Sequence, residues 1–150
     1  MSNGKRCGAG ALAVMLLTAP ITGAHTAAAR DTPRFVGTWR LVSETQTGIM
    51  IYDGLGNMAA QVMPNRMRRK YAAAEPTPDE AKDAITGYLA YFGTYSVDEQ
   101  TRIVTHHRHG NINPGQVGDD VVRAYVFESN DRLVLTPAGS TNKIVWERAR

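Results

Sequence analysis

Cysteine is nearly absent from the sequence: Cys7 is the single cysteine among 150 residues, and it lies close to the N-terminus. A domain built from the later residues therefore has no disulfide, no thiol nucleophile and no thiolate ligand for a metal. At about 120 residues, such a domain is large enough to be stable on its hydrophobic core alone.

A long hydrophobic run is also missing. The apolar stretch Ala9–Leu17 is shorter than the roughly 20 residues that a membrane-spanning helix needs. It follows a short basic segment and precedes several alanines, which together form the three-part pattern of a cleavable signal peptide. We expect residues 1–29 to be that signal peptide, cleaved for example after Ala29, rather than a retained N-terminal anchor. Residues 30–150 are then one periplasmic or secreted domain with no stable membrane anchor.

The expected domain has no excess of either charge. Of the 17 basic residues, Lys5 and Arg6 leave with the signal peptide, so 15 remain against 14 acidic residues. The one basic cluster, residues 66–70, is smaller than the patch with which a domain usually binds nucleic acid. We expect no nucleic-acid partner and interpret this cluster as a solvated loop, with contact to an anion as the alternative.

Motifs for a bound phosphate, a dinucleotide or an esterase nucleophile are missing as well. The adjacent acids Asp119 and Asp120 lie at a loop end and face opposite ways if they are on a strand, so they form a poor acid–base pair. We therefore expect no cofactor, and the sequence identifies no catalytic residue.

Short segments of alternating polarity, separated by turn residues, fill the chain from Phe35 onward. This pattern is typical of a β-sandwich or β-barrel. The expected strands are residues 36–46, 48–52, 58–63, 94–97, 101–109, 120–128, 132–136 and 142–148. Eight antiparallel strands can close on themselves, which removes the exposed sheet edges and leaves an interior wide enough for one small ligand.

One helix interrupts this pattern. Thr77 is a good N-cap, Pro78 suits the first helical turn, and Glu80 completes a capping box. Apolar residues then recur at helical spacing, so we predict one α-helix of about 14 residues near 78–91.

Three segments carry a family resemblance. They are GTWRLVS at 37–43; YLAYFGTY at 88–95 followed by VTHH at 104–107; and RAY at 123–125 followed by DRLVL at 131–135 and VWER at 145–148. In this order they resemble the bacterial and fungal lipocalin-like domain family, over most of the chain from Phe35 to Arg148. The resemblance implies a mainly β fold, an antiparallel up-and-down barrel. Family members usually have a longer insert than Ser43–Gly48, so a strand or a lid loop is expected to be shortened here.

The G-x-W segment has a structural interpretation beside the resemblance. Trp39 is large enough to plug one end of a barrel, and Arg148 can stack on its ring because the first and last strands become neighbours. Similar Trp and Arg pairs close the bottom of lipocalins. We expect Gly37, Trp39 and Arg148 to close the barrel rather than to bind a ligand.

Three histidines lie on one expected strand. Alternation places His107 and His109 on one face, and His106 on the other together with Arg102 and Arg108. Because two arginines indicate a solvent-exposed face, we expect His107 and His109 to point inward. Ligand contact, proton transfer and a hydrogen-bonding role in the core all remain open for them. A metal site would need a third ligand that the sequence does not specify, and we expect none.

Arg123, Tyr125 and Phe127 share one face of their strand. If that face is inward, Arg123 can hold a carboxylate through charge-assisted hydrogen bonds. Hydrophobicity alone favours the opposite orientation, with Val122 and Ala124 inside, so both alternatives stay open. Further candidates for the pocket lining are Tyr52, Met63, Tyr91, Tyr95 and Trp146.

Three functions are compatible with these residues. The first, which we favour, is a binding protein for a small hydrophobic or amphipathic molecule, with a carboxylate or carbonyl as an optional polar group. The second is a cofactor-free isomerase, cyclase or hydratase that uses His107, Arg123 and Tyr95 in an enclosed pocket. The third is a structural or interaction protein whose barrel is filled by side chains.

Overall fold

The structure is a computed structural model of the whole chain, and it describes residue 1 and residues 30–150. The predicted signal peptide, its cleavage after Ala29 and the single cysteine lie outside the described residues.

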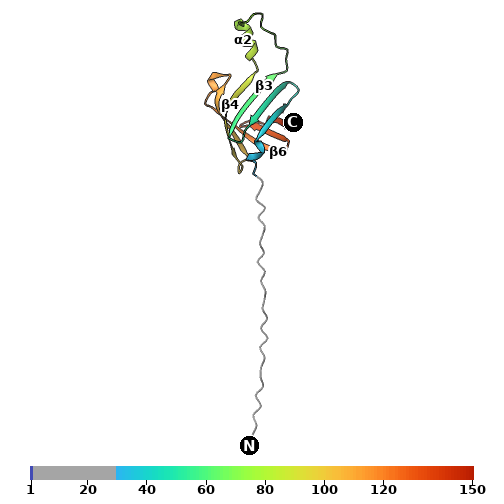
Figure 1. Cartoon of the computed structure of the whole chain (residues 1–150), viewed down its shortest axis with the longest axis vertical. Helices are drawn as coiled ribbons and strands as arrows, with labels where there is room; N and C mark the ends of the chain where they lie inside the picture. The colour runs from blue at the N-terminus through green and yellow to red at the C-terminus, as the bar shows by residue number, and fades with distance from the viewer. Residues whose placement is uncertain (2–29) are drawn as a thin grey trace.

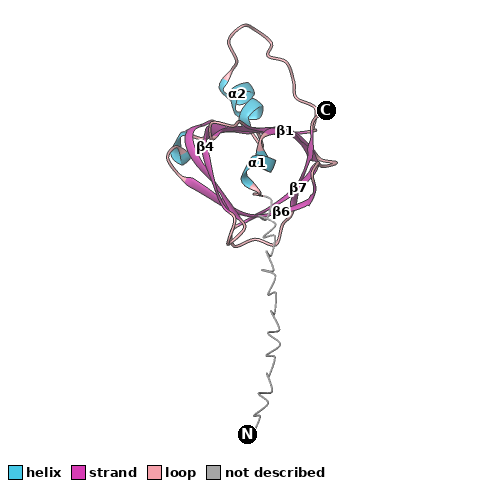
Figure 2. Ribbon diagram, turned by 60° about the horizontal axis from the view of Figure 1, so that its bottom comes forward, coloured by secondary structure: helices cyan, strands magenta, loops and turns pink. Residues whose placement is uncertain are grey.

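Eight antiparallel strands form a closed barrel in which each strand pairs with the next and β1 pairs with β8 (Figures 1 and 2). The strands are β1 (Gly37–Val42), β2 (Gln46–Tyr52), β3 (Asn57–Pro64), β4 (Leu89–Asp98), β5 (Ile103–Asn111), β6 (Asp120–Ser129), β7 (Arg132–Pro137) and β8 (Ile144–Arg148). The mainly β, up-and-down barrel predicted from the sequence is confirmed. The brief connection after β1 does not prevent closure, because the Ser43 hydroxyl accepts hydrogen bonds from the amides of Thr45 and Gln46 and so supports the tight turn into β2.

The alternation of side chains explains which residues fill the barrel. Along β3, for example, Met58, Ala60 and Val62 are buried, whereas Gln61 is exposed. Such alternation fixes the register, since a shift by one residue would turn every apolar side chain toward water.

Helix α2 (Pro78–Ile85) projects from the barrel between β3 and β4 (Figure 1). It begins with the predicted capping box of Thr77 and Glu80, but it is shorter than the predicted helix and ends at Ile85. The chain leaves the helical conformation at Gly87, which has a φ of 76°, and Leu89 then pairs with Val62 in the sheet. Residues from Leu89 onward, whose spacing suggests a longer helix, are therefore part of strand β4. Within residues 30–150, no helix is long and apolar enough to cross a membrane.

A second helix, α1 (Thr32–Phe35), was not expected from the sequence and lies across one end of the barrel (Figure 2). Its Phe35 is fully buried, with ring centroids 5.3 Å from Tyr52, 5.0 Å from Tyr125 and 5.0 Å from Phe127. Burial of such a side chain contributes roughly 1.5–3 kcal/mol to stability. The end of the barrel that α1 covers is called the closed end below.

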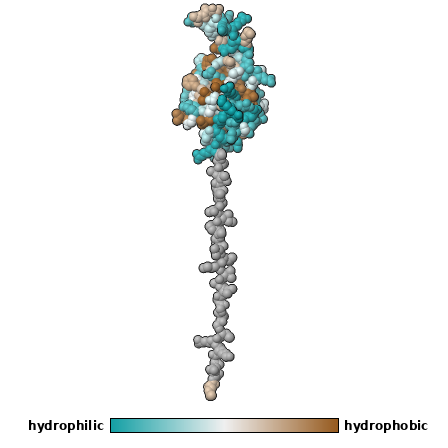
Figure 3. All heavy atoms as spheres, turned by 45° about the vertical axis from the view of Figure 1, so that its right-hand side comes forward, coloured by the Kyte–Doolittle hydropathy of each residue, from teal (hydrophilic) through white to brown (hydrophobic). Residues whose placement is uncertain are grey.

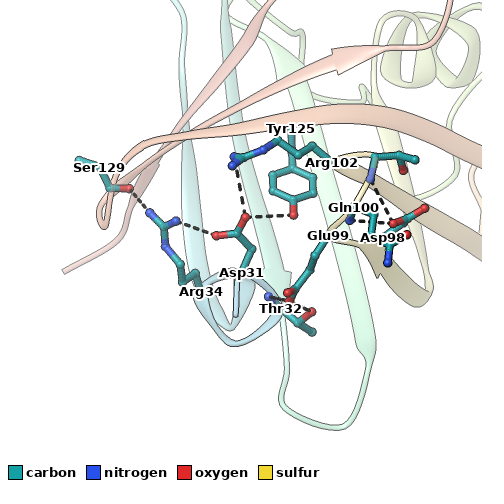
Figure 4. Close-up of polar contacts among 10 residues, drawn as sticks. Asp31, Thr32, Arg34, Asp98, Glu99, Gln100, Arg102, Tyr125 and Ser129 are labelled. Carbon is teal, nitrogen blue, oxygen red and sulfur yellow. Dashed lines mark hydrogen bonds and ion pairs between the residues drawn. The ribbon is translucent and has the colours of Figure 1, made fainter. Parts of the chain in front are cut away.

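Polar contacts anchor α1 (Figure 4). The Asp31 carboxylate accepts a hydrogen bond from Tyr125 at 3.1 Å and pairs with Arg34 at 2.8 Å, while Glu99 accepts from both the amide and the hydroxyl of Thr32. These contacts join the start of the domain to turns at the closed end. The opposite end of the barrel, from which α2 projects, is called the mouth.

Candidate functional site

A cavity of about 280 Å³ lies inside the barrel. Its walls are largely apolar and come from several strands; they are formed by Leu41, Gln46, Met50, Ala60, Val62, Leu89, Tyr91, Arg123, Leu135, Ile144 and Trp146. A larger hollow of about 900 Å³ lies on the outside, next to charged side chains such as Arg132 and Glu147. The interior cavity is the better candidate for a ligand site, because small-molecule pockets are concave and mainly apolar with a few polar groups.

The cavity has a polar floor formed by Tyr91 and Arg123 and, beneath them, by His106, which is fully buried and is not itself part of the lining. Tyr52 places its hydroxyl 2.6 Å from Nε2 of His106, and Tyr91 places its hydroxyl 2.8 Å from Nδ1. The Arg123 guanidinium also lies 3.1 Å from Nδ1. Alternate strands β2, β4 and β6 thus each direct one polar group to the imidazole on β5.

The partners of His106 define its protonation. Arginine can only donate, so Nδ1 is the acceptor and Nε2 carries the proton that is donated to the Tyr52 oxygen. Burial, the Arg123 charge and His107 together hold the pKa of His106 well below its ordinary value of 6.5. Burial also raises the pKa of Tyr91. The floor therefore combines a neutral imidazole and neutral phenols with Arg123, the one cation of the cavity lining within residues 30–150.

The depressed pKa predicts acid sensitivity. Because unfolded His106 binds a proton near pH 6.5 and folded His106 does not, the free energy of unfolding should fall as the pH drops below that value. The slope should reach at most about 1.4 kcal/mol per pH unit. A His106→Gln variant should show a flatter profile between pH 6.5 and 4 in denaturant titrations. The exposed His109→Gln variant is the control, and an equal slope in His106→Gln and the unmodified protein would contradict the assignment.

The closed end lies on the far side of this floor. Trp39 is fully buried, its indole N–H donates to the Phe35 carbonyl at 2.8 Å, and Arg148 lies 4.3 Å from the centre of its ring. Arg148 also donates to the carbonyl of Val36 at 2.8 Å. Gly37 has a φ of 137°, and a side chain there would collide with the Arg148 guanidinium. The barrel is therefore sealed at this end, which leaves the mouth as the route to the cavity.

The sequence model of a lipocalin-like domain matches residues 36–149, a range that includes all eight strands of the barrel. The chain belongs to the lipocalin-like domain family. A comparison with curated proteins finds no match. The family resemblance seen in the three sequence segments is thereby confirmed.

The lipocalin-like barrel brings only some of the predicted pocket residues to the cavity. Tyr91, Arg123 and Trp146 line it, and Tyr52 lies beneath its floor. The side chains of Tyr95, Tyr125 and Phe127 are inside the barrel but pack around Phe35 at the closed end. Met63 is on the outer face, 37% exposed, because the inward position next to it belongs to Val62.

The predicted inward orientation of His107 and His109 is wrong. His109 is exposed, and His107 lies on the outside, between Asp120 and Ser96. The prediction took Arg102 and Arg108 as markers of a solvent-exposed face. Arg102 precedes β5 in a turn, however, and Arg108 is buried, with its charge neutralised by Asp119 at 3.0 Å.

Ser96, His107 and Asp120 are connected in the same order as the serine, histidine and aspartate of a hydrolase catalytic triad. Its Nδ1 lies 2.7 Å from the Asp120 carboxylate and its Nε2 lies 3.0 Å from the Ser96 hydroxyl. All three side chains, however, stand on the outer face of the sheet, where the nearby amides are engaged in the strand ladder. Amides engaged in that way do not form an oxyanion hole. We interpret the three residues as a cross-strand hydrogen-bond network.

The lipocalin-like barrel also separates the three residues of the enzymatic alternative. Arg123 lines the cavity, His107 is outside, and the Tyr95 hydroxyl donates to the Asp53 carbonyl at the closed end. His106, the central floor residue, was not selected from the sequence. The one signal for it was its neighbour Val104, an apolar residue two positions earlier that shares its face. Within residues 30–150, no group of three or more His, Cys, Asp or Glu side chains is arranged to hold a metal ion.

Proposed function

We propose that the protein binds a small, largely apolar molecule in the barrel cavity, with an anionic headgroup of that molecule at Arg123. The lipocalin-like fold and the apolar cavity walls support the apolar part of this ligand. Export, predicted from residues 1–29, belongs to the same proposal, in which the protein meets its ligand outside the cytoplasm.

The Arg123 guanidinium is the observation that carries the anionic headgroup. It lines the cavity, and its hydrogen-bond partner among the described residues is the neutral His106. None of the carboxylates in residues 30–150 forms an ion pair with it. A half-buried cation without a counterion is unfavourable, and a carboxylate from a ligand would supply the missing charge.

Besides Arg123, the Tyr91 hydroxyl and the Trp146 indole N–H favour a ligand that carries oxygen atoms. Tyr91 and Arg123 both direct donors at Nδ1 of His106, so one acceptor serves two donors and either can turn to a ligand oxygen. The buried indole N–H of Trp146, also on the cavity wall, has no acceptor within the described part of the chain. Buried donors without acceptors are costly, which favours a ligand that brings acceptors.

The cavity volume limits the size of the ligand. At roughly 30 Å³ for each water-sized group, the 280 Å³ holds about nine such groups. Octanoate is therefore a suitable probe, and octanol is its uncharged counterpart of nearly equal length.

A pair of adjacent alanines provides the test of cavity binding. Ala60 is buried and lines the cavity, whereas Ala59 faces the outside of the same strand. We expect Ala60→Phe to fill the cavity and to lower octanoate affinity by more than about tenfold, as measured by calorimetry. Ala59→Phe is the matched control and should bind normally. Unchanged binding by a folded Ala60→Phe variant would exclude the cavity as the site.

A further inference from the structure

A loop and a helix form a projection beside the mouth of the barrel (Figures 1 and 3). The loop, residues 65–77, leaves the end of β3, and α2 returns the chain to Leu89, a residue of the cavity wall. Helix α2 buries none of its residues. The projection is thus held mainly by polar contacts and not by the barrel core.

The basic cluster at 66–70 divides into two pairs. Arg66 donates to the Asp83 carbonyl at 2.6 Å, and Arg68 donates to the Ala84 carbonyl, so both cap the last turn of α2. Arg69 and Lys70 are exposed, and neither has a hydrogen-bond or ion-pair partner among the described residues. Two cations at the tip of the projection are therefore free to bind an external anion.

Apolar side chains lie beside these free cations. Met67 is 91% exposed and Tyr71 is 45% exposed, and the three alanines at 72–74 are exposed as well. Tan, mildly hydrophobic atoms are visible at the tip of the projection in Figure 3. From residue 66 to residue 74 the sequence contains four basic residues and no acidic one.

We propose that residues 67–74 bind the surface of an anionic lipid bilayer. In this arrangement Arg69 and Lys70 meet lipid phosphates while Met67 and Tyr71 enter the interface between headgroups and acyl chains. Basic residues near an anionic surface, and aromatic residues at the interface, are favourable there. A hollow of about 380 Å³ lies between this segment and α2, and its lining is mainly basic and aromatic. The mixture of free cations with exposed apolar side chains matches a bilayer surface better than an acidic protein.

This contact places the barrel mouth against the membrane. Its consequence rests on the proposed function: an amphipathic ligand would pass between the bilayer and the cavity without crossing bulk water. The bilayer contact itself depends on the projection and not on the cavity, so the two proposals fail separately.

A fluorescent reporter tests the contact in the full-length chain. Trp39 and Trp146 are buried, so a Met67→Trp variant adds one exposed indole whose emission reports on the loop. We expect a blue shift with vesicles of phosphatidylcholine and phosphatidylglycerol, and none with phosphatidylcholine alone. Charge reversal by Arg69→Glu and Lys70→Glu should weaken the apparent affinity about thirtyfold. Charge reversal of Arg30 and Arg150, at the closed end, is the matched control and should leave the affinity unchanged.

Three outcomes would overturn the proposal. Vesicle binding without a change in the reporter emission would show that another part of the chain makes the contact. An equal effect of both charge reversals would show nonspecific attraction. An equal blue shift with polyglutamate, which also displaces the vesicles, would assign the surface to an acidic protein partner. Ala60→Phe in the reporter background should keep the vesicle response while it loses octanoate, which separates this proposal from that of cavity binding.

Discussion

Octanoate should bind about a hundredfold more weakly when Arg123 is replaced by glutamine, because the cavity lining formed by residues 30–150 then loses its one cation. Octanol, which carries no charge, should bind both proteins with similar affinity. The expected difference arises from the headgroup alone, since glutamine retains hydrogen-bonding ability and most of the volume. Calorimetric titration of both compounds into both proteins measures it.

Stability provides the control for Arg123→Gln. In the ligand-free protein the arginine has no carboxylate partner among residues 30–150, so its removal should not lower the free energy of unfolding. Arg123→Lys keeps the charge but not the planar guanidinium. Its affinity for octanoate should lie between those of the unmodified protein and Arg123→Gln. Equal weakening of octanoate and octanol would contradict an anionic headgroup site.

Replacement of Trp39 by alanine should lower the free energy of unfolding by about 3–5 kcal/mol, as for other buried aromatic residues. The side chain is fully buried, donates to the Phe35 carbonyl at 2.8 Å and supports Arg148 above its ring. The substitution would open a cavity and release both contacts at the closed end. Denaturant titration of the two proteins gives the difference.

Trp39→Phe is the graded control for this prediction. It keeps most of the ring but not the N–H donor, so it should lower the free energy of unfolding by less than Trp39→Ala does. Octanoate affinity should change little in a folded Trp39→Phe protein, because Trp39 is not part of the cavity lining. A loss below about 1 kcal/mol for alanine would show that α1 and Arg148 close the barrel without the indole.

The barrel was predictable because its signals are local. Alternating polarity and turn residues predict the strands, and Thr77 and Glu80 define the start of α2. The end of α2 was not predictable, because Leu89 fits both a helical and a strand pattern until its partner Val62 is known. Helix α1 was missed because four residues carry too little periodicity, and only packing of Phe35 against distant strands fixes it.

The site was less predictable, because it depends on which face of a strand is inward. For β6 the alternation of side chains allows both orientations, and the structure places Arg123 inside. For β5 the predicted inward face is wrong, because Arg108 is buried and Asp119 from the following loop neutralises its charge. That pairing joins residues 11 positions apart across a loop, and strand alternation does not report it. The same error places His106 on the outer face, although its side chain is fully buried inside the barrel.

The sealed end has a consequence for how the barrel is used. Since α1, Trp39 and Arg148 block one side, loading and unloading share a single opening. In the proposed function, the headgroup at Arg123 would enter first and leave last, so a bound molecule would depart tail first. Under the proposed function, a donor and an acceptor of the ligand would have to use the mouth one after the other, as with a carrier that shuttles between them and not with a conduit that connects both at once.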